Sequence, residues 1–199
     1  MSELFDRLAD HYERGHAREL DHQISFAGNV PEAVTKAAVL IAITNRAEPG
    51  VLLTHRRADM RKHAGQVAFP GGKLDPGEDA VQAALREAHE ELGIDPADVR
   101  VIGQSDSLLT GSGYDLTPVL AVVPPDLPLV PNPHEVSAWF EAPLAHVLDP
   151  ANHVAKETHF GGVLRPYIEI MWDEHRIWGI TAAIIVNLSR RLEWLERAR

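Results

Sequence analysis

The sequence predicts an α/β domain in which a mixed β-sheet lies between helices. Strand-like segments alternate with helical ones along the chain, so that some strands pair locally and others pair across helices. The 199 residues are enough for one domain, and no internal repeat or low-complexity tract divides them. We therefore expect a single domain over 1–199, with a helix and an irregular lead-in in 1–34 and a final helix in 181–199.

The order of the elements follows from local patterns of apolar, branched and turn residues. Ser2 can cap the first helix, and Pro49-Gly50 marks a turn between two strands that we expect to form a hairpin. Gly93 is well placed to end the second helix. The expected helices cover 2–15, 79–92, 143–149 and 181–197. The expected strands cover 35–45, 51–56, 99–104, 115–123 and 135–141, followed by a hairpin over 158–172. A short strand within 65–72 is expected to end at Pro70.

Composition limits the classes of function. The formal net charge of −10 argues against sequence-independent binding of nucleic acid. The chain has no Cys, which excludes disulfides, thiolate metal sites and Cys nucleophiles. Its polar start does not resemble a signal peptide, and its longest apolar run, 37–43, is far shorter than the ~20 residues of a membrane span. We expect a soluble cytoplasmic protein that binds neither nucleic acid nor membrane.

The segment REAHEELG, 86–93, gathers three carboxylates on one helix. At about 100° per residue, Glu87, Glu90 and Glu91 form a stripe that is separate from the apolar face. A solvated acidic face is the ordinary interpretation, and Arg86 could pair with Glu90 one turn later. Hard oxygen ligands at this spacing also suit Mg²⁺ or Mn²⁺. The preceding loop, FPGGKLDPGE, can turn backbone groups toward a phosphate or a metal ion.

The spacing of this segment resembles the Nudix box, G-x5-E-x7-R-E-U-x-E-E-x-G-U, in which U is a bulky aliphatic residue. Every fixed position is met, from Gly72 through Glu78 to Gly93, although Ala88 is smaller than the usual residue at its U position. The resemblance implies an α/β/α sandwich with a mixed β-sheet between helices. It also implies a magnesium-dependent hydrolase that cuts the pyrophosphate of a nucleoside diphosphate linked to another group.

The resemblance implies a role for each charged residue of the box. Glu87, Glu90 and Glu91 are the implied ligands of the divalent cofactor, Mg²⁺ or Mn²⁺. Glu78 is expected to orient the loop or Arg86, and Arg86 to fix the carboxylates by charge-assisted hydrogen bonds. These five residues form the expected catalytic set.

The general base of the hydrolysis stays open. In the implied mechanism the metal ions neutralise the diphosphate, a carboxylate takes a proton from water, and the water oxygen attacks phosphorus. The carboxylate is either a box glutamate or an acid from a later loop, for which Glu135 and Glu141 are the candidates. His89 lies off the carboxylate stripe and is expected on the helix surface.

A second pattern lies directly upstream of the box. The segment 52–72 resembles the signature of the coenzyme A pyrophosphatase branch, L-L-T-x-R-[small]-x3-R-x3-G-x3-F-P-G-G, from which Arg57 departs. This resemblance implies cleavage of coenzyme A or its derivatives to 3′,5′-ADP and 4′-phosphopantetheine. A basic cluster here suits the extra 3′-phosphate of that substrate, although a solvated patch has the same composition. The expected substrate contacts are Arg56, Arg61, Lys62, Gly71 and Gly72, and His55 and His63 flank the cluster.

Other interpretations remain open. A different Nudix enzyme would act on ADP-ribose, NADH or a dinucleoside polyphosphate, and a Nudix-fold protein without catalysis would only bind nucleotide. RNA decapping is disfavoured by the net charge. We expect a small nucleotide as the partner, and a homodimer is left open. Trp139, Trp172 and Trp178 are expected in the core or at an interface, although one of them could stack on an adenine.

Overall fold

The computed structural model describes residues 2–20, 24, 34–57, 59, 65–160 and 163–194. Its helices are α1 (Glu3–His16), α2 (Ala80–Leu92), α3 (Leu144–Leu148) and α4 (Gly179–Leu192), with 3-10 turns at Pro96–Asp98 and Pro150–Asn152. Its strands are β1 (Thr35–Thr44), β2 (Gly50–Arg56), β3 (Val67–Ala68), β4 (Gly71–Lys73), β5 (Arg100–Gln104), β6 (Leu108–Leu109), β7 (Tyr114–Val123), β8 (Val136–Pro143), β9 (Val154–Phe160), β10 (Val163–Trp172) and β11 (His175–Trp178).

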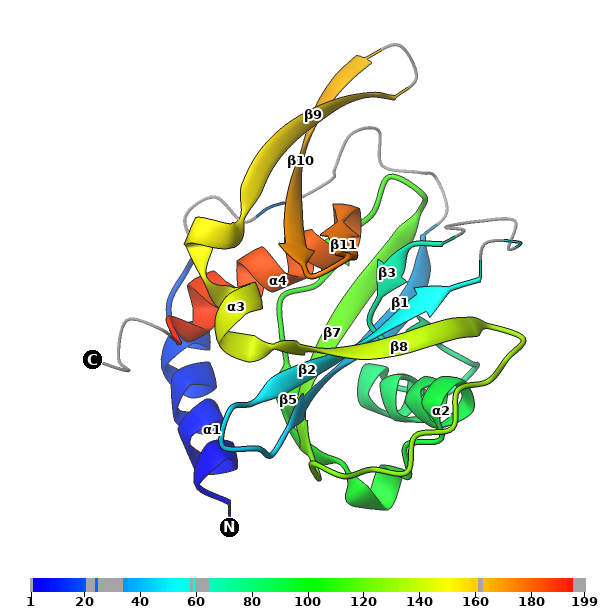
Figure 1. Cartoon of the computed structure of the whole chain (residues 1–199), viewed down its shortest axis with the longest axis vertical. Helices are drawn as coiled ribbons and strands as arrows, with labels where there is room; N and C mark the ends of the chain where they lie inside the picture. The colour runs from blue at the N-terminus through cyan, green and yellow to red at the C-terminus, as the bar shows by residue number, and fades with distance from the viewer. Residues whose placement is uncertain are drawn as a thin grey trace.

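The main sheet is mixed, as expected. Its central path runs β3-β2-β1-β7-β5, with β8 paired to β2, β4 to β1 and β6 to β7. Strand β1 is parallel to β7 over its whole length and antiparallel to β2 across the predicted turn. A separate antiparallel sheet, β11-β10-β9, stands beside it, and its hairpin of β9 and β10 projects from the body (Figure 1).

The main sheet has a hydrophobic core on each face, because successive side chains of β1 point to opposite faces. Val39 and Ile41 belong to the core beneath α1, α3 and α4, while Ala38 and Leu40 belong to the core beneath α2. Figure 1 shows α2 on one side of the sheet and α1, α3 and α4 on the other. The predicted α/β/α sandwich is therefore confirmed.

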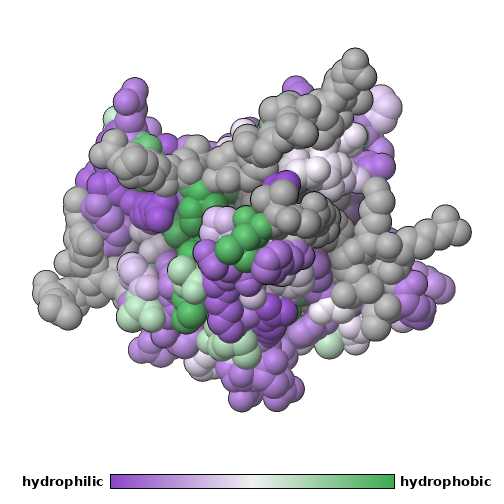
Figure 2. Space-filling view, turned by 90° about the horizontal axis from the view of Figure 1, so that it is seen from above, coloured by the Kyte–Doolittle hydropathy of each residue, from purple (hydrophilic) through white to green (hydrophobic). Residues whose placement is uncertain are grey.

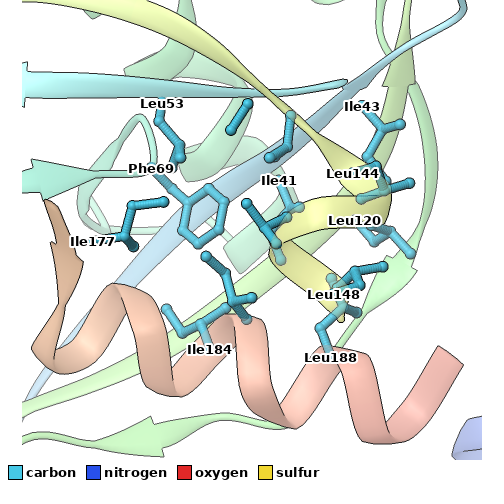
Figure 3. Close-up of a cluster of buried hydrophobic side chains, with 14 of the residues drawn as sticks. Ile41, Ile43, Leu53, Phe69, Leu120, Leu144, Leu148, Ile177, Ile184 and Leu188 are labelled. Atoms are coloured by element: carbon cyan, nitrogen blue, oxygen red, sulfur yellow. The ribbon is translucent and has the colours of Figure 1, made fainter. Parts of the chain in front are cut away.

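Helix α4 provides much of the larger core. Ile184 and Leu188 point from α4 toward Ile41 and Leu120 of the sheet (Figure 3). Each fully buried side chain of this size contributes about 1.5–3 kcal/mol to folding. Burial extends around most of the helix, because α1, α3 and the smaller sheet also pack near it.

Helix α2 has well-defined ends. Asp79 and Gln82 form a capping box at its start, and Gly93 ends it in the left-handed conformation with φ of 71°. Ala83, Ala84 and Ala88 are fully buried where the helix meets the sheet. The small residue at 88 is thus explained by close approach of α2 to the strands beneath it.

The short strand expected in 65–72 ends before Pro70, as predicted, since β3 covers Val67–Ala68. The chain then joins β1 as a further strand, β4, which was not expected. Two expectations need correction. The last helix ends at Leu192 rather than 197, because Glu193 takes a left-handed φ of 46°. The final hairpin begins at Val154, four residues before the predicted start.

One face of the molecule is mostly polar (Figure 2). Seen from above, it is largely hydrophilic, and apolar atoms gather in small patches near the middle of the view (Figure 2). None of the helices in the described ranges has the length and apolar character needed to cross a membrane.

Candidate active site

Arg86 of α2 is the centre of a hydrogen-bond network. Its Nε donates to Glu78 Oε1 at 2.8 Å, and its Nη1 donates to Glu87 Oε1 at 2.9 Å and to Glu90 Oε2 at 3.1 Å. Its Nη2 donates to the carbonyl oxygen of Lys73 at 2.9 Å. The expected positioning role of Arg86 agrees with this geometry, since one guanidinium holds three box carboxylates and the loop.

Glu91 lies on the buried side of α2. Glu91 is only 2% exposed, and burial raises the pKa of its carboxyl to about 8. Glu91 Oε1 is 3.7 Å from Arg56 Nη1, and Glu91 Oε2 accepts a hydrogen bond from the Gly71 amide at 3.3 Å. The side chain therefore joins α2, β2 and β4 at one point.

Arg56, at the end of β2, has an unusual environment. Its Nε is buried and is the single buried side-chain polar atom in the described residues without a hydrogen-bond partner. Such a group costs about 1–3 kcal/mol unless a partner is supplied. The rest of the guanidinium is accessible, since the side chain is 24% exposed, so Arg56 can offer a charged donor to an anionic ligand beside Glu91.

The other carboxylates differ in their environments. Burial raises the pKa of Glu87, and the hydrogen bond from Arg86 opposes this effect. The hydrogen bond from Arg86 lowers the pKa of Glu78, which favours its ionised form. The side chain of Glu90 is 50% exposed, so the predicted stripe has one buried, one half-buried and one exposed carboxylate.

The two later acids lie in different places. The charge of Glu135, just before β8, acts on both Glu87 and Glu91 and adds to the rise of their pKa values. Glu141, further along β8, instead accepts hydrogen bonds from Thr44 and Arg46. Only the first of the two candidates faces the carboxylates of α2.

Two glycines leave space for these side chains. A Cβ on Gly72 would lie 2.4 Å from Glu87 Oε1, and a Cβ on Gly71 would lie 2.4 Å from the carbonyl oxygen of Ala38. Gly71 also has a φ of 159°. The absence of a side chain at Gly72 lets the Glu87 carboxylate lie directly on the backbone of β4, and its absence at Gly71 lets β4 approach β1 closely.

Comparison with known proteins decides the family. The model of the NUDIX domain matches residues 34–163. The chain is 44% identical over 158 residues to the uncharacterized Nudix hydrolase NudL of Escherichia coli K12, which covers 79% of this chain and 82% of the relative. The chain belongs to the Nudix hydrolase family. NudL of Escherichia fergusonii is 45% identical over 159 residues, with the same coverage.

Among solved structures, this Nudix hydrolase is similar to an Ap4A hydrolase of C. elegans in a binary complex. The two are 26% identical with a TM-score of 0.47, over 54% of this chain and 80% of the other. Its family membership makes the protein a hydrolase of nucleoside diphosphate derivatives that needs a divalent metal ion.

The side chains of the box supply oxygen atoms of the kind that bind a divalent metal ion. Carboxylate oxygens are the ligands that small divalent cations prefer, and Glu87 is close enough to Glu91 to help raise the pKa of the Glu91 carboxyl. In the described part of the chain no three acidic or His side chains already converge as a metal site. The box carboxylates instead contact Arg86 and Arg56, so an ion would replace part of this neutralising charge.

The structure brings together most of the predicted site residues. Glu78, Arg86, Glu87 and Glu90 form one network, and Arg56, Gly71 and Glu91 meet beside it. The predicted substrate contacts Arg61 and Lys62, and the flanking His63, lie outside the described residues.

His55 lies against His175, with Nε2 to Nδ1 at 2.9 Å, and burial lowers its pKa, so it does not present a protonated ring to a phosphate. Trp139 is 40% exposed, which excludes the core and leaves an interface or a stacking role for it. His89 is exposed on α2, as expected.

Sequence reasoning missed the support of α2 from the loop after β7. The amides of Val130 and Asn132 donate to the carbonyl oxygens of Leu92 and Glu91, at 2.8 and 2.9 Å. This contact fixes the end of α2 and brings Glu135 near the carboxylates. Only backbone groups take part, so no side-chain pattern in the sequence could have revealed it.

Proposed function

We propose that this Nudix hydrolase cleaves the pyrophosphate bond of coenzyme A or a derivative to 3′,5′-ADP and 4′-phosphopantetheine. The observation that carries the proposal is Arg56. It is a fixed residue of the coenzyme A pyrophosphatase signature, and its Nη1 lies 3.7 Å from Glu91 of the box. Its side chain is 24% exposed, so a substrate phosphate can accept a hydrogen bond from the exposed part of the guanidinium.

Glu87, Glu90 and Glu91 are the proposed ligands of Mg²⁺ or Mn²⁺. A bound divalent ion neutralises the diphosphate and favours ionisation of a water molecule. Arg86 keeps Glu87 and Glu90 together before an ion binds, through hydrogen bonds of 2.9 and 3.1 Å. Glu78, held in its ionised form, fixes Arg86 itself.

Glu135 is the proposed general base, because its charge acts on two of the proposed ligands while Glu141 is engaged elsewhere. Its carboxylate takes a proton from the attacking water. The new bond joins the water oxygen to phosphorus, and the bridging P–O bond breaks with its electron pair on the leaving phosphate. Protons then return to solvent, and two phosphomonoesters remain.

The substrate contacts follow from position. Arg56, beside Glu91, is the proposed contact of a diphosphate oxygen. Gly71 and Gly72 remain predictions as substrate contacts, because Ala38 and Glu87 already lie against their Cα atoms. Arg61 and Lys62 remain predictions for the 3′-phosphate.

A panel of substrates tests the proposal. Initial rates are compared for coenzyme A, acetyl coenzyme A, ADP-ribose, NADH and diadenosine tetraphosphate at millimolar Mg²⁺ and Mn²⁺, with products identified by mass spectrometry. We expect the highest kcat/KM for coenzyme A or its acyl derivative, and 4′-phosphopantetheine or its acyl form as a product. Much faster cleavage of ADP-ribose would contradict the proposed substrate, and no hydrolysis of any of them would indicate a binding protein.

A further inference from the structure

A cavity of about 270 Å³ lies on the same face of the main sheet as α2, away from the box carboxylates. Thr44 and Leu52 line its inner side, at the end where β1 and β2 join. Trp139 of β8 and apolar residues of the loop after β7 form its walls. Trp139 is 40% exposed and contributes an aromatic ring to the wall.

Polar groups gather on the rim of this cavity. Arg46 donates from Nε to both carboxylate oxygens of Glu141, at 3.2 and 3.3 Å, and from Nη1 to Asp126 at 3.3 Å. Thr44 donates to the same Glu141 carboxylate. The donors of Arg46 are therefore directed to protein groups, while two carboxylates have further acceptor sites for a ligand.

Gly50 leaves room for the side chain of Glu141. A Cβ on Gly50 would lie 2.3 Å from Glu141 Cγ, so the Glu141 side chain lies across a position that only glycine leaves open. The cavity thus combines an aromatic wall, an apolar floor and a fixed carboxylate at its edge.

The cavity is aligned with the catalytic residues. Leu52 and Arg56 are four residues apart on β2 and both face α2, which places their Cα atoms ~13 Å apart along the strand. Trp139 pairs with Thr54, between these two positions. The ribose and phosphates of an extended nucleotide cover a comparable length, so its base and its diphosphate can occupy the two places together.

We propose that this cavity binds the nucleobase of the substrate and selects a base with an exocyclic amino group, as in adenine. The ring stacks on Trp139, and the amino group donates to the carboxylate of Glu141 or Asp126. A base with an oxo group at that position would place one acceptor against another and lose this contact.

This inference deepens the proposed function, because coenzyme A carries adenine, but it concerns binding of the base alone. Its test therefore uses nucleosides, which have no diphosphate to be cut. Calorimetry measures the dissociation constants of adenosine and inosine for the wild-type protein, for Trp139→Ala and for Trp139→Phe. Thermal melts confirm that the variants are folded, which we expect because Trp139 is partly exposed.

Adenosine is expected to bind the wild type at least about tenfold more tightly than it binds Trp139→Ala, while Trp139→Phe keeps most of the affinity. Inosine is expected to bind the wild type more weakly than adenosine. Equal adenosine affinities for wild type and Trp139→Ala, or no adenosine binding to the wild type at millimolar concentration, would overturn the inference.

Asp126→Asn tests the rim separately. The side chain of Asp126 is 85% exposed, so we expect the variant to fold like the wild type. We expect the preference for adenosine over inosine to shrink, and a preference of unchanged size would exclude Asp126 as the acceptor. The two proposals can fail separately. If only the coenzyme A proposal is wrong, adenosine still binds through Trp139, and the substrate panel shows another adenine-containing diphosphate as the substrate.

Discussion

Arg86 determines where the box carboxylates point when no ion is bound. Three like charges on one helix repel each other, and a single guanidinium offsets this repulsion through hydrogen bonds to Glu87 and Glu90. Glu91 has a different partner, Arg56, and its burial keeps its pKa high. The residues of one sequence motif therefore occupy two distinct electrostatic environments.

The backbone beside Glu87 gives a test at this scale. Gly72→Ala would place a Cβ 2.4 Å from Glu87 Oε1 and displace that carboxylate. Because a shift of about 1 Å in a catalytic group can cost 10²-fold, we expect kcat for coenzyme A to fall by that order. The melting temperature should change little, since the end of a flexible side chain can move. Steady-state kinetics measure the effect.

Gly111→Ala is the matched control, because a Cβ there would meet no atom within 4 Å. It should leave both kcat and the melting temperature unchanged. Equal activity of the two alanine variants would contradict the placement of Glu87 against β4.

The proposed base gives a second test. Glu135→Gln keeps the size of the side chain but cannot accept the proton, so we expect kcat to fall by about 10²-fold or more with KM nearly unchanged. Glu157→Gln on the exposed strand β9 serves as the control and should be fully active. A Glu135→Gln enzyme with wild-type kcat would return the role of base to a box glutamate.

At the scale of elements, the packing of α2 on the sheet positions the whole site. Ala88 is fully buried at this contact. We expect Ala88→Leu to lower the free energy of unfolding by about 1–3 kcal/mol, because the added methyl groups force α2 away from β1. Urea denaturation measures the change. Ala97→Leu, on the exposed turn after α2, should be close to neutral, and equal stability of the two variants would refute the close contact.

The elements show what could be predicted from sequence. The limits of α2 were predictable, because a cap, an apolar stripe and Gly93 are all local signals. The pairing of β3 with β2 and of β4 with β1 could not be predicted, because it depends on how β1 and β2 diverge in space. The pairing of Arg56 with Glu91 joins positions 35 residues apart in the sequence, and no local spacing predicts it. The cavity beside Trp139 likewise depends on three distant segments.

At the scale of the whole molecule, Arg191 joins the two terminal helices to the sheet. It donates to both carboxylate oxygens of Asp106, at 2.6 and 2.7 Å, and to the carbonyl oxygen of Gly15 at 2.9 Å. The hydrogen bonds from Arg191 lower the pKa of the Asp106 carboxyl. The contact therefore stabilises the docking of α1 and α4 only while Asp106 is ionised.

The sign of the resulting pH dependence follows directly. Since the pKa of Asp106 is lower in the folded protein than in the unfolded chain, its contribution is present above about pH 4 and is lost as the pH falls through the folded value. We expect Asp106→Asn to lower the free energy of unfolding by about 2 kcal/mol at pH 7, and the difference from wild type to shrink below about pH 4.

Denaturation curves at pH 7 and pH 3 measure this difference. Asp126→Asn removes a carboxylate from an exposed ion pair and should have little effect on stability at either pH. A deficit of Asp106→Asn that is as large at pH 3 as at pH 7 would show that its cause is not the charge of Asp106.

The central claim is that carboxylates of α2 hold the divalent ion that hydrolysis of the diphosphate needs. The most direct measurement is kcat of Glu91→Gln with coenzyme A at saturating Mg²⁺, alongside its thermal melt. The Gly71 amide can still donate to the amide oxygen of Gln, so the fold should be retained. We predict a loss of several orders of magnitude in kcat with a cooperative melt. Near-normal turnover by the folded variant would contradict the account.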